Sequence, residues 1–229
     1  ALKLGAEVVS PHLALAYNEI LSSGVIPPGF GDSVTKLLPK GGDSTLFKNY
    51  RPISLLPVPQ KVMTAILNRR CQPVFDSALG PEQSGFRKGH STTDCIHVMN
   101  LIISNCKEYN LPLYLLFLDI SKAFDSVTME AVLSAMERQG VHSHITSFVQ
   151  NLSQNSNSAV VVNGIPVPIN IGRGVRQGDC LSPRLFTAVL QEVFGSMPWS
   201  RKGININGQF ISHLLFADDA VLISHDARQ

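Results

Sequence analysis

The sequence predicts an α+β fold built around a mostly antiparallel sheet. Short apolar segments typical of strands are interspersed with longer segments in which apolar residues recur at helical spacing. Two Asn-Gly pairs, Asn163-Gly164 and Asn207-Gly208, stand between apolar runs and are typical of two-residue hairpin turns. The chain contains no internal repeat, so a solenoid or propeller is not expected.

The composition is that of a globular protein. At 229 residues and 24.9 kDa, with 44% hydrophobic residues, the chain can form one large domain or two small lobes with a sizeable core. Its longest clean apolar run, Leu113 to Leu118, is far too short to span a bilayer, and no signal-peptide pattern follows Lys3. The four cysteines form no Cys-x-x-Cys pair. We therefore expect a soluble protein of a reducing compartment with no membrane partner.

The net charge of +2 conceals an uneven distribution. Residues 36–90 hold nine basic and three acidic side chains, whereas residues 1–35 and 91–229 each carry a net charge of −2. A basic stretch of this kind is either a solvated face or a phosphate-binding surface. Charge alone does not decide between the two.

Apolar periodicity and capping residues locate the helices. They predict helices over 6–23 (ended by Gly24), 58–70 and 129–139 (after Thr128), and helix starts at the capping box of Ser91 and at Ser182-Pro183. The expected core face of the last helix consists of Leu185, Phe186, Val189, Leu190, Val193 and Phe194. The segment around His142 and His144 is expected to be a surface loop.

The strands are predicted from apolar runs and turn residues. The run 113–118 does not alternate, which predicts a strand buried on both faces. Segments 159–163 and 165–171 are expected to form one hairpin, and 204–206 with 210–216 another.

Carboxylates interrupt the apolar pattern at two places. Asp119 ends one apolar strand, and Asp218-Asp219 interrupt a second at what must be a tight turn. Two carboxylates about 4 Å apart repel by roughly 4 kcal/mol at an effective dielectric constant of 20, a repulsion that a divalent metal ion reverses. Three carboxylates at adjacent strand ends could hold two Mg²⁺ ions. The alternative is that Asp218-Asp219 is merely a polar turn.

Five sequence segments follow one another along the chain: Arg51–Leu56 (RPISLL), Gln83–Gly89 (QSGFRKG), Leu118–Asp125 (LDISKAFD), Gly174–Pro183 (GVRQGDCLSP) and Phe216–Asp219 (FADD). Together, and in this order, they closely resemble the reverse transcriptases of non-LTR (LINE-type) retrotransposons, with the RTE-like branch as the most similar. The resemblance runs from about Pro27 to the C-terminus.

The resemblance implies a catalytic and metal-binding role for the carboxylates. Asp119 and Asp218 would be the principal ligands of two Mg²⁺ ions, for which Mn²⁺ can substitute, and Asp219 would assist. The backbone carbonyl of Ile120 is a further expected ligand. Asp125 matches a family position but is expected to act in local capping or to support a neighbouring site residue rather than as a ligand.

The resemblance also implies residues that bind the incoming nucleotide. Phe124, with Ala123 beside it, occupies the position of an aromatic gate that selects deoxynucleotides, the alternative being an ordinary core phenylalanine. Gln177 and Gly178 would contact the nucleotide and its template base. Arg51 would bind the triphosphate. A second phosphate contact would come from Lys40 or Lys36, because the segment Leu37–Asp43 departs from the family pattern.

The template is expected to be held by basic side chains. Arg87 and Lys88 would touch template phosphates, and Arg176 and Arg173 would either do the same or be solvated. Contacts of this kind position a strand without reading its sequence. The basic excess in residues 36–90 is then explained, because these residues fall in the fingers.

The implied architecture is the fingers and palm of a right-hand polymerase, forming one reverse transcriptase core with no thumb. Residues 1–110 would be mainly fingers, 111–127 and 174–229 palm, and 128–173 would return to the fingers. The implied function is RNA-directed DNA synthesis from an RNA template, a DNA primer and dNTPs. The alternatives are an inactive or truncated domain that binds RNA or RNA–DNA duplex, and a domesticated interaction scaffold. The nucleus and cytoplasm are the expected locations of a retrotransposon product, and the oligomeric state is left open.

Overall fold

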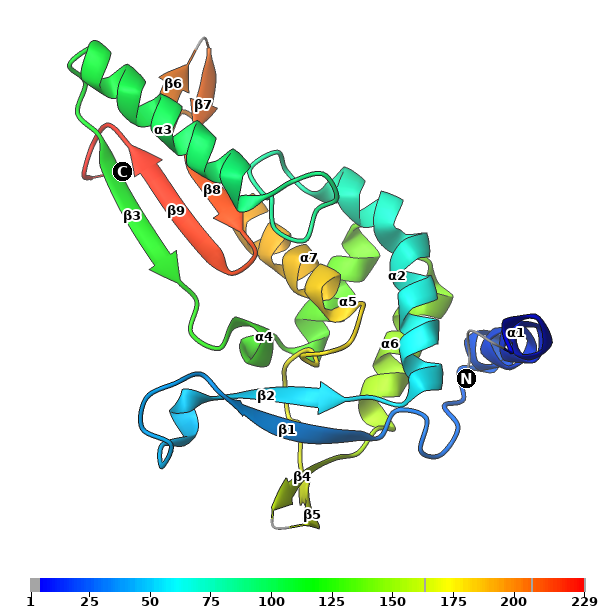
Figure 1. Ribbon diagram of the computed structural model, residues 1–229. Helices are drawn as coiled ribbons and strands as arrows, with labels where there is room; N and C mark the ends of the chain where they lie inside the picture. Colours follow the sequence, from blue (N-terminus) through cyan, green and yellow to red (C-terminus); the bar gives the residue numbers. More distant parts are fainter. Residues whose placement is uncertain (1–4, 163, 207, 229) are drawn as a thin grey trace. The chain divides into compact units, whose positions relative to one another are not determined.

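The computed structural model describes residues 5–162, 164–206 and 208–228. The chain divides into two compact units (Figure 1). The first unit consists of Ala1–Val74 and Phe124–Phe186, and the second of Phe75–Ala123 and Thr187–Gln229. The fingers and palm boundaries are functional assignments that this division does not test, so they stay a prediction.

Helices account for much of both units. They are α1 (Ala6–Ser23), α2 (Val58–Ala78), α3 (Thr92–Glu108), α4 (Ala123–Ser126), α5 (Met129–Arg138), α6 (Ser143–Gln154) and α7 (Ser182–Gly195), with a short 3₁₀ helix over Phe47–Asn49. No described helix is both long enough and apolar enough to cross a membrane.

The described strands form three sheets, in which all pairings but one are antiparallel. The strands are β1 (Ser33–Pro39), β2 (Tyr50–Leu55), β3 (Tyr114–Asp119), β4 (Ser158–Val162), β5 (Ile165–Ile169), β6 (Ile204–Ile206), β7 (Gln209–Ile211), β8 (His213–Phe216) and β9 (Asp219–Ser224). The first unit holds the order β2-β1-β4-β5, in which β1 and β4 run parallel. The second unit holds β3-β9-β8 and the pair β6-β7. The α+β prediction is confirmed, with three sheets in place of one.

The predicted helix ends are confirmed where capping chemistry defines them. Gly24 follows α1 in the left-handed conformation (φ 70°) and donates its N–H to the Ile20 carbonyl. At the start of α3 the backbone N–H of Ser91 donates to the Asp94 carboxylate at 2.7 Å. The Thr128 hydroxyl accepts from the Ala131 N–H at the start of α5.

Helix α6 was not predicted from the sequence, and neither was the four-residue helix α4. The segment taken as a surface loop around His142 and His144 begins α6. The Nδ1 atom of His142 accepts from the backbone N–H of His144, so the imidazole acts as the helix cap. His142 is not among the residues that most often cap helices, which is why the sequence did not reveal this start.

The expectation that residues 113–118 form a strand buried on both faces is wrong. Strand β3 is largely exposed, with Leu116 55% and Phe117 71% accessible. The reason is strand order, because β3 lies at the edge of the β3-β9-β8 sheet and pairs only with β9 among the described strands. An edge strand can have an uninterrupted apolar sequence even where no other elements pack against both of its faces.

Two smaller expectations also need correction. Val193, assigned to the core face of α7, is 47% exposed. Residues 210–216 form two strands in place of one, because the chain breaks at the buried Ser212, whose carbonyl accepts from the Ile223 N–H. The predicted hairpins at residues 158–169 and 204–211 are present, while Asn163 and Asn207 of their turns lie outside the described residues.

The core of the second unit lies between α3 and the sheet. Its buried members come from α3, β6 and β9, and Leu113 and Leu115 pack against them. They are Ile102, Cys106, Ile204, Val221 and Ile223. This packing holds β9, and with it the segment that begins at Asp219, against a helix.

We predict that Ile102→Ala lowers the free energy of unfolding by about 2–5 kcal/mol, since Ile102 is 1% exposed and its truncation leaves a cavity. Its neighbour Leu101, which is 54% exposed on the same helix, is the matched control. Leu101→Ala should change stability by about 0.5 kcal/mol or less. Equal losses in chemical denaturation would contradict the placement of this core.

Candidate active site

The residues that bear the three predicted carboxylates lie at one end of the β3-β9-β8 sheet. Strand β3 ends at Asp119 and β9 begins at Asp219, and the two residues are direct partners in the antiparallel register. Directly opposed residues of an antiparallel pair project from the same face, with Cβ atoms roughly 4.5–5.5 Å apart. Asp119 and Asp219 therefore lie side by side although 100 positions separate them in the sequence.

Asp218 lies in the turn that joins β8 to β9. Phe216 pairs with Asp219, which leaves a connection of two residues, Ala217 and Asp218. Ala217 has φ 56°, as the first central residue of a type II′ turn requires, a position where glycine is preferred. A non-glycine residue in this region costs about 1–3 kcal/mol and persists only when its surroundings hold it there.

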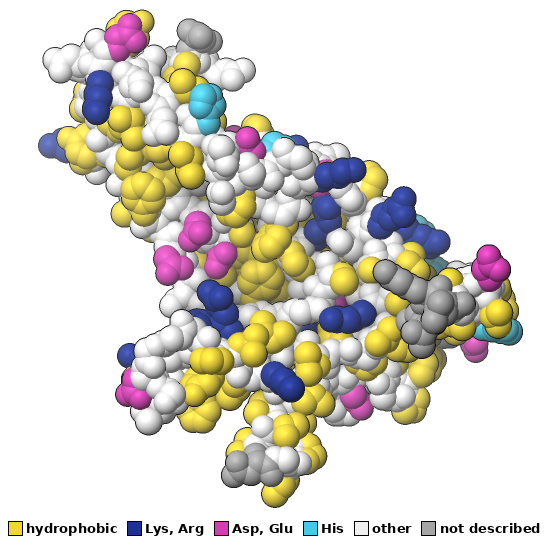
Figure 2. Space-filling model, viewed as in Figure 1, with side chains coloured by type: hydrophobic (Ala, Val, Ile, Leu, Met, Phe, Trp, Pro, Cys, Tyr) yellow, Lys and Arg dark blue, Asp and Glu magenta, His cyan; other side chains and the backbone are white. Residues whose placement is uncertain are grey.

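The donor set suits a hard divalent cation. Among the described residues, the carboxylates of Asp119, Asp218 and Asp219 take part in no hydrogen bond or ion pair, and no three Asp, Glu, His or Cys side chains converge into a ready-made cage. Figure 2 shows acidic side chains gathered on the surface at this end of the β3-β9-β8 sheet. Mg²⁺ prefers oxygen ligands and is usually bound by one or two carboxylates together with waters and substrate phosphates. An open set of carboxylates fits that mode of binding.

The segment Gln83–Gly85 packs directly against this turn. The Leu215 N–H donates to the Glu82 carbonyl at 2.8 Å, and the Ser84 N–H donates to the Leu215 carbonyl at 2.9 Å. The amide oxygen of Gln83, a side chain only 1% exposed, accepts from the Ala217 N–H at 3.1 Å. The sequence had assigned no role to Gln83, and its place in the QSGFRKG segment was the only signal.

In the first unit, the loop of residues 173–178 is fixed by close backbone approaches. Gly174 donates its N–H to the Val127 carbonyl at 2.7 Å, and Val175 donates to the Phe124 carbonyl at 2.8 Å. At the other end the Ser54 N–H donates to the Gln177 carbonyl at 2.9 Å. The loop therefore joins strand β2 to helix α4.

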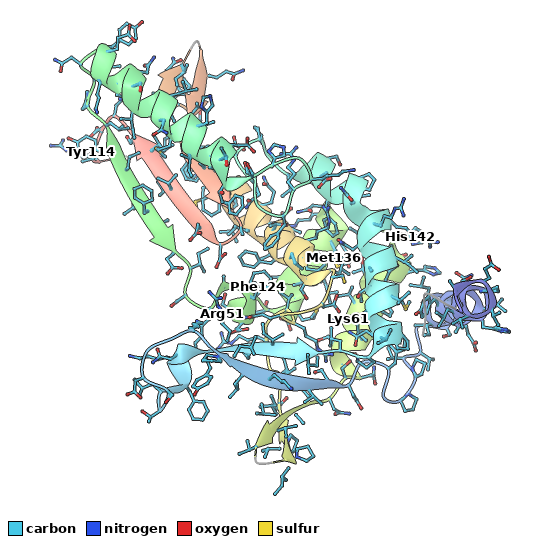
Figure 3. All side chains as sticks on the ribbon, in the orientation of Figure 1. Arg51, Lys61, Tyr114, Phe124, Met136 and His142 are labelled. Carbon is cyan, nitrogen blue, oxygen red and sulfur yellow. The ribbon has the colours of Figure 1, made fainter. Side chains whose placement is uncertain are left out.

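The predicted nucleotide-binding residues of this loop region are themselves connected. The side-chain amide of Gln177 donates to Asp125 at 3.3 Å, a contact that the sequence did not reveal. The ring of Phe124 stacks on Phe186 of α7, with centroids 4.8 Å apart and planes at 17°. Phe124 can be found by its label in Figure 3. The contact shows a packing role for Phe124, and its role as a gate stays a prediction. Ala123 is buried at the start of α4.

The predicted phosphate-binding side chains share one exposed face of the β1–β2 hairpin. Arg51 pairs with Leu38, and Lys36 pairs with Ile53, so Lys36 and Arg51 project from the same face. Lys40 continues this alternation, since its N–H donates to the Asn49 carbonyl beyond the end of β1. Arg51, labelled in Figure 3, and both lysines are exposed. The register places both lysines on the Arg51 face and does not choose between them.

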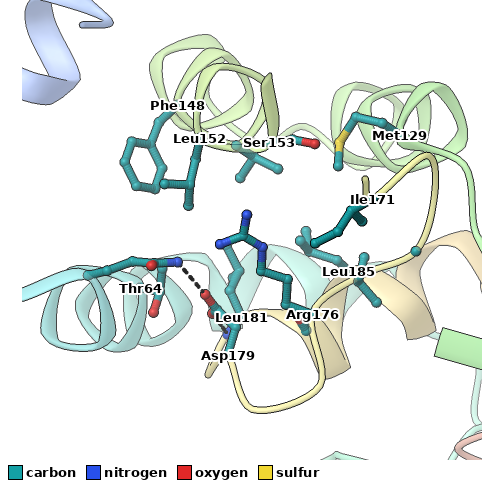
Figure 4. Close-up of a pocket in the computed structure, with 15 residues that line it drawn as sticks. Thr64, Met129, Phe148, Leu152, Ser153, Ile171, Arg176, Asp179, Leu181 and Leu185 are labelled. Atoms are coloured by element: carbon teal, nitrogen blue, oxygen red, sulfur yellow. Dashed lines mark hydrogen bonds between the residues drawn. The ribbon is translucent and has the colours of Figure 1, made fainter. Parts of the chain in front are cut away.

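Arg176 is engaged within its own unit. Its guanidinium donates to the Gly31 carbonyl and lies beside Asp179, between α6 and α2 (Figure 4). Burial lowers the pKa of the Arg176 guanidinium and raises the pKa of the Asp179 carboxyl. The surrounding cavity measures about 60 Å³, room for a few water molecules only. These contacts support a structural role for Arg176, and its binding of nucleic acid stays a prediction.

The remaining predicted residues lie at the surface of the second unit. Arg87 is half-buried and donates to the Gly80 carbonyl at 3.2 Å, whereas Lys88 is exposed. Ile120 is half-buried and directly follows the end of β3. Their expected contacts with template and metal stay predictions.

Known structures share this fold. An apo telomerase from Candida tropicalis truncated from its C-terminal domain superposes with a TM-score of 0.62 at 16% identity, over 96% of this chain and 49% of that chain. A telomerase from Candida albicans in complex with a TWJ fragment of telomeric RNA gives a TM-score of 0.56 at 12% identity, over 89% of this chain and 40% of that chain. These similarities show that the chain has the fold that these telomerase structures contain.

The sequence identifies the family. Residues 38–229 match the family of reverse transcriptases (RNA-dependent DNA polymerases), and the chain belongs to this family. The resemblance to non-LTR retrotransposon enzymes is confirmed by the curated relatives, whereas its RTE-like branch stays a prediction.

Three relatives illustrate the match. The Pol polyprotein from the type-1 retrotransposable element R2 of Popillia japonica is 33% identical over 89% of this chain and 29% of its own length. The RNA-directed DNA polymerase from the mobile element jockey of Drosophila melanogaster is 31% identical over 93% of this chain and 23% of its own. The transposon TX1 149 kDa protein of Xenopus laevis is 26% identical over 96% and 17%. The chain thus spans less than a third of each relative.

We predict that Gly178→Ala lowers the free energy of unfolding by about 1–3 kcal/mol. Gly178 has φ 114°, and a Cβ atom there would lie 2.7 Å from the Ser54 carbonyl oxygen. Gly172, whose Cβ would meet no atom within 4 Å, is the matched control. Thermal unfolding of Gly178→Ala that matches Gly172→Ala would contradict the close approach of this loop to β2.

Proposed function

We propose that this chain catalyses the template-directed addition of deoxynucleotides to a primer 3′ end, copying RNA in preference to DNA. The observation that carries the proposal is the register pair of Asp119 and Asp219 with Asp218 in the adjoining turn. Membership of the reverse transcriptase family supports it. RNA template, DNA primer and dNTPs are the proposed substrates.

The second unit contributes the carboxylates. Asp119 and Asp218 would be the principal ligands of two Mg²⁺ ions, assisted by Asp219 and the Ile120 carbonyl. When bound, such ions lower the pKa of an attacking hydroxyl and neutralise charge on the phosphates. The β3–β9 register fixes the backbones of Asp119 and Asp219 relative to each other, which supports the proposal because pre-positioned groups lower the entropic cost of reaction. Mn²⁺ would substitute for Mg²⁺ because it also accepts oxygen ligands.

The first unit contributes the proposed nucleotide contacts. Arg51 can fork onto two phosphate oxygens, and either lysine on the same face of the hairpin can add a point charge. Gln177, oriented by Asp125, would contact the nucleotide and template base. Gly178, which has no side chain, would let the nucleotide and the template base approach the backbone closely. In the second unit, Arg87 and Lys88 would touch template phosphates.

We predict that Asp218→Asn reduces primer extension on an RNA template with Mg²⁺ by at least about 1,000-fold, because it removes a charge that holds the metal ions. Asp226→Asn is the matched control, since Asp226 lies in the same unit beyond the other end of β9. Extension should be measured with this chain and with a version that includes any flanking coding sequence. Both variants should retain the wild-type circular dichroism spectrum.

The outcomes separate the proposal from its alternatives. Extension by Asp218→Asn at the wild-type rate would overturn the assignment of the carboxylates. Salt-dependent RNA binding without extension by the wild type would favour a non-catalytic RNA-binding domain. Absence of RNA binding altogether would favour a scaffold that has kept only the fold.

We predict that Phe124→Ala raises the incorporation of ribonucleotides relative to deoxynucleotides, because a smaller side chain would admit a 2′-hydroxyl. Phe186→Ala is the control, since it removes the same ring stack from the other side. Both variants should lose stability, and sugar selection should change more in Phe124→Ala than in Phe186→Ala, because Phe186 would act only by orienting the Phe124 ring. An equal ribonucleotide-to-deoxynucleotide ratio in wild type and Phe124→Ala would limit Phe124 to packing.

A further inference from the structure

The turn that carries Asp218 has to be held in place by its neighbours. Ala217 adopts a positive φ without being glycine, and the adjoining carboxylates repel one another. Two nearby residues of the same unit, Phe86 (φ 56°) and Lys122 (φ 52°), are also non-glycine residues at positive φ. Sparsely populated backbone conformations therefore gather around the segments that bear or support the carboxylates.

The Gln83 side chain forms hydrogen bonds with this turn. Its amide oxygen accepts from the N–H of Ala217 at 3.1 Å and from the N–H of Gly85 at 2.7 Å. Its amide nitrogen reaches the Ala217 carbonyl at 3.5 Å. Since Gln83 is 1% exposed and Ala217 8% exposed, water cannot readily replace these contacts. A glutamine in this position satisfies both polar groups of the strained residue.

Gly85 makes the approach possible. A Cβ atom on Gly85 would lie 2.0 Å from the Ala217 nitrogen and 2.7 Å from its Cα. Both are backbone atoms, so no side-chain rotation could relieve the overlap. The backbone of the QSGFRKG segment thus lies in direct contact with the backbone of the turn.

We infer that Gln83 is a positioning residue that, with Gly85, clamps the Ala217–Asp218 turn and so sets where the Asp218 and Asp219 carboxylates stand. The inference rests on the proposed function, because it assigns those carboxylates the role of binding the metal ions. Displacement of catalytic groups by as little as 1 Å can lower a rate by about 100-fold. The side chain of Gln83 touches neither substrate nor metal in this scheme and acts only through the turn.

The test compares Gln83→Met, which keeps the side-chain volume but accepts no hydrogen bond, with Gln83→Glu, which still accepts from both N–H groups. The first measurement is amide hydrogen exchange at Ala217 and Gly85, which needs no catalysis. Gln83→Met should speed exchange at both amides by about 10- to 100-fold. Gln83→Glu, which keeps the acceptor but lacks the donor to the Ala217 carbonyl, should restore part of the protection.

The second measurement is primer extension as a function of Mg²⁺ concentration, expressed per folded molecule. Gln83→Met should lower kcat by about 10- to 100-fold and raise the Mg²⁺ concentration for half-maximal rate, leaving the Kd for primer–template unchanged. Phe75→Leu, a core variant of the same unit outside the α3–β9 packing, controls for lost stability and should change neither value. Gly85→Ala should behave as Gln83→Met does, whereas Gly195→Ala, whose Cβ would have its nearest neighbour at 4.0 Å, should not.

The outcomes keep this inference separate from the proposed function. Unchanged amide exchange in Gln83→Met, or faster exchange with unchanged kcat and Mg²⁺ dependence, would overturn the inference. Failure of Gln83→Glu to restore protection would do the same, because packing would then be the cause. If the wild type extends no primer, the proposed function fails. The inference about Gln83 is then tested by Mn²⁺ affinity in the presence of dNTP, measured by paramagnetic resonance for the wild type and for Gln83→Met. Gln83→Met should weaken that affinity, and equal affinities or no binding by either protein would overturn it.

Discussion

The constraint on which the rest of the structure depends is the juxtaposition of like charges at the end of one sheet. The β3–β9 register places Asp119 opposite Asp219, and the two-residue turn adds Asp218 beside them. Carboxylates held this close repel, so the surrounding backbone must supply the rigidity that their charges oppose. Helix α3 packs on β9 through the buried core, and the Gln83 side chain accepts a hydrogen bond from the turn at Ala217. The fold itself thus fixes the backbone positions of the three carboxylate residues.

The first unit shows the same dependence on backbone contacts. The loop before α7 is joined to β2 at one end and to the residues around α4 at the other. Gly174 and Gly178 stand where another chain segment passes within about 3 Å of their missing Cβ atoms. Side chains that were singled out for ligand contact, Phe124 and Gln177, are oriented here by Phe186 and Asp125. The side chains proposed to contact a nucleotide are therefore held in place by other residues of the same unit.

Exposure in the second unit follows from strand order. Strand β3 is uniformly apolar yet sits at the edge of its sheet, so Leu116 and Phe117 remain accessible next to the carboxylates. In the first unit, by contrast, the basic Arg176 turns inward to Gly31 and Asp179. Hydrophobic sequence and basic charge did not by themselves decide which side chains would be buried, because burial depends on which elements become neighbours.

The sequence alone determined the class of fold, the principal helix ends and the family, because capping boxes, turn residues and ordered motifs are local signals. It also singled out three carboxylates, whose catalytic role stays a prediction. Only the tertiary structure decided that Asp119 and Asp219 are register partners, that β3 is an edge strand and that His142 caps a helix. It alone revealed the contact of Gln83 with Ala217, residues separated by 134 positions. Contacts between distant segments depend on strand order and packing, and no local pattern of residue types encodes them.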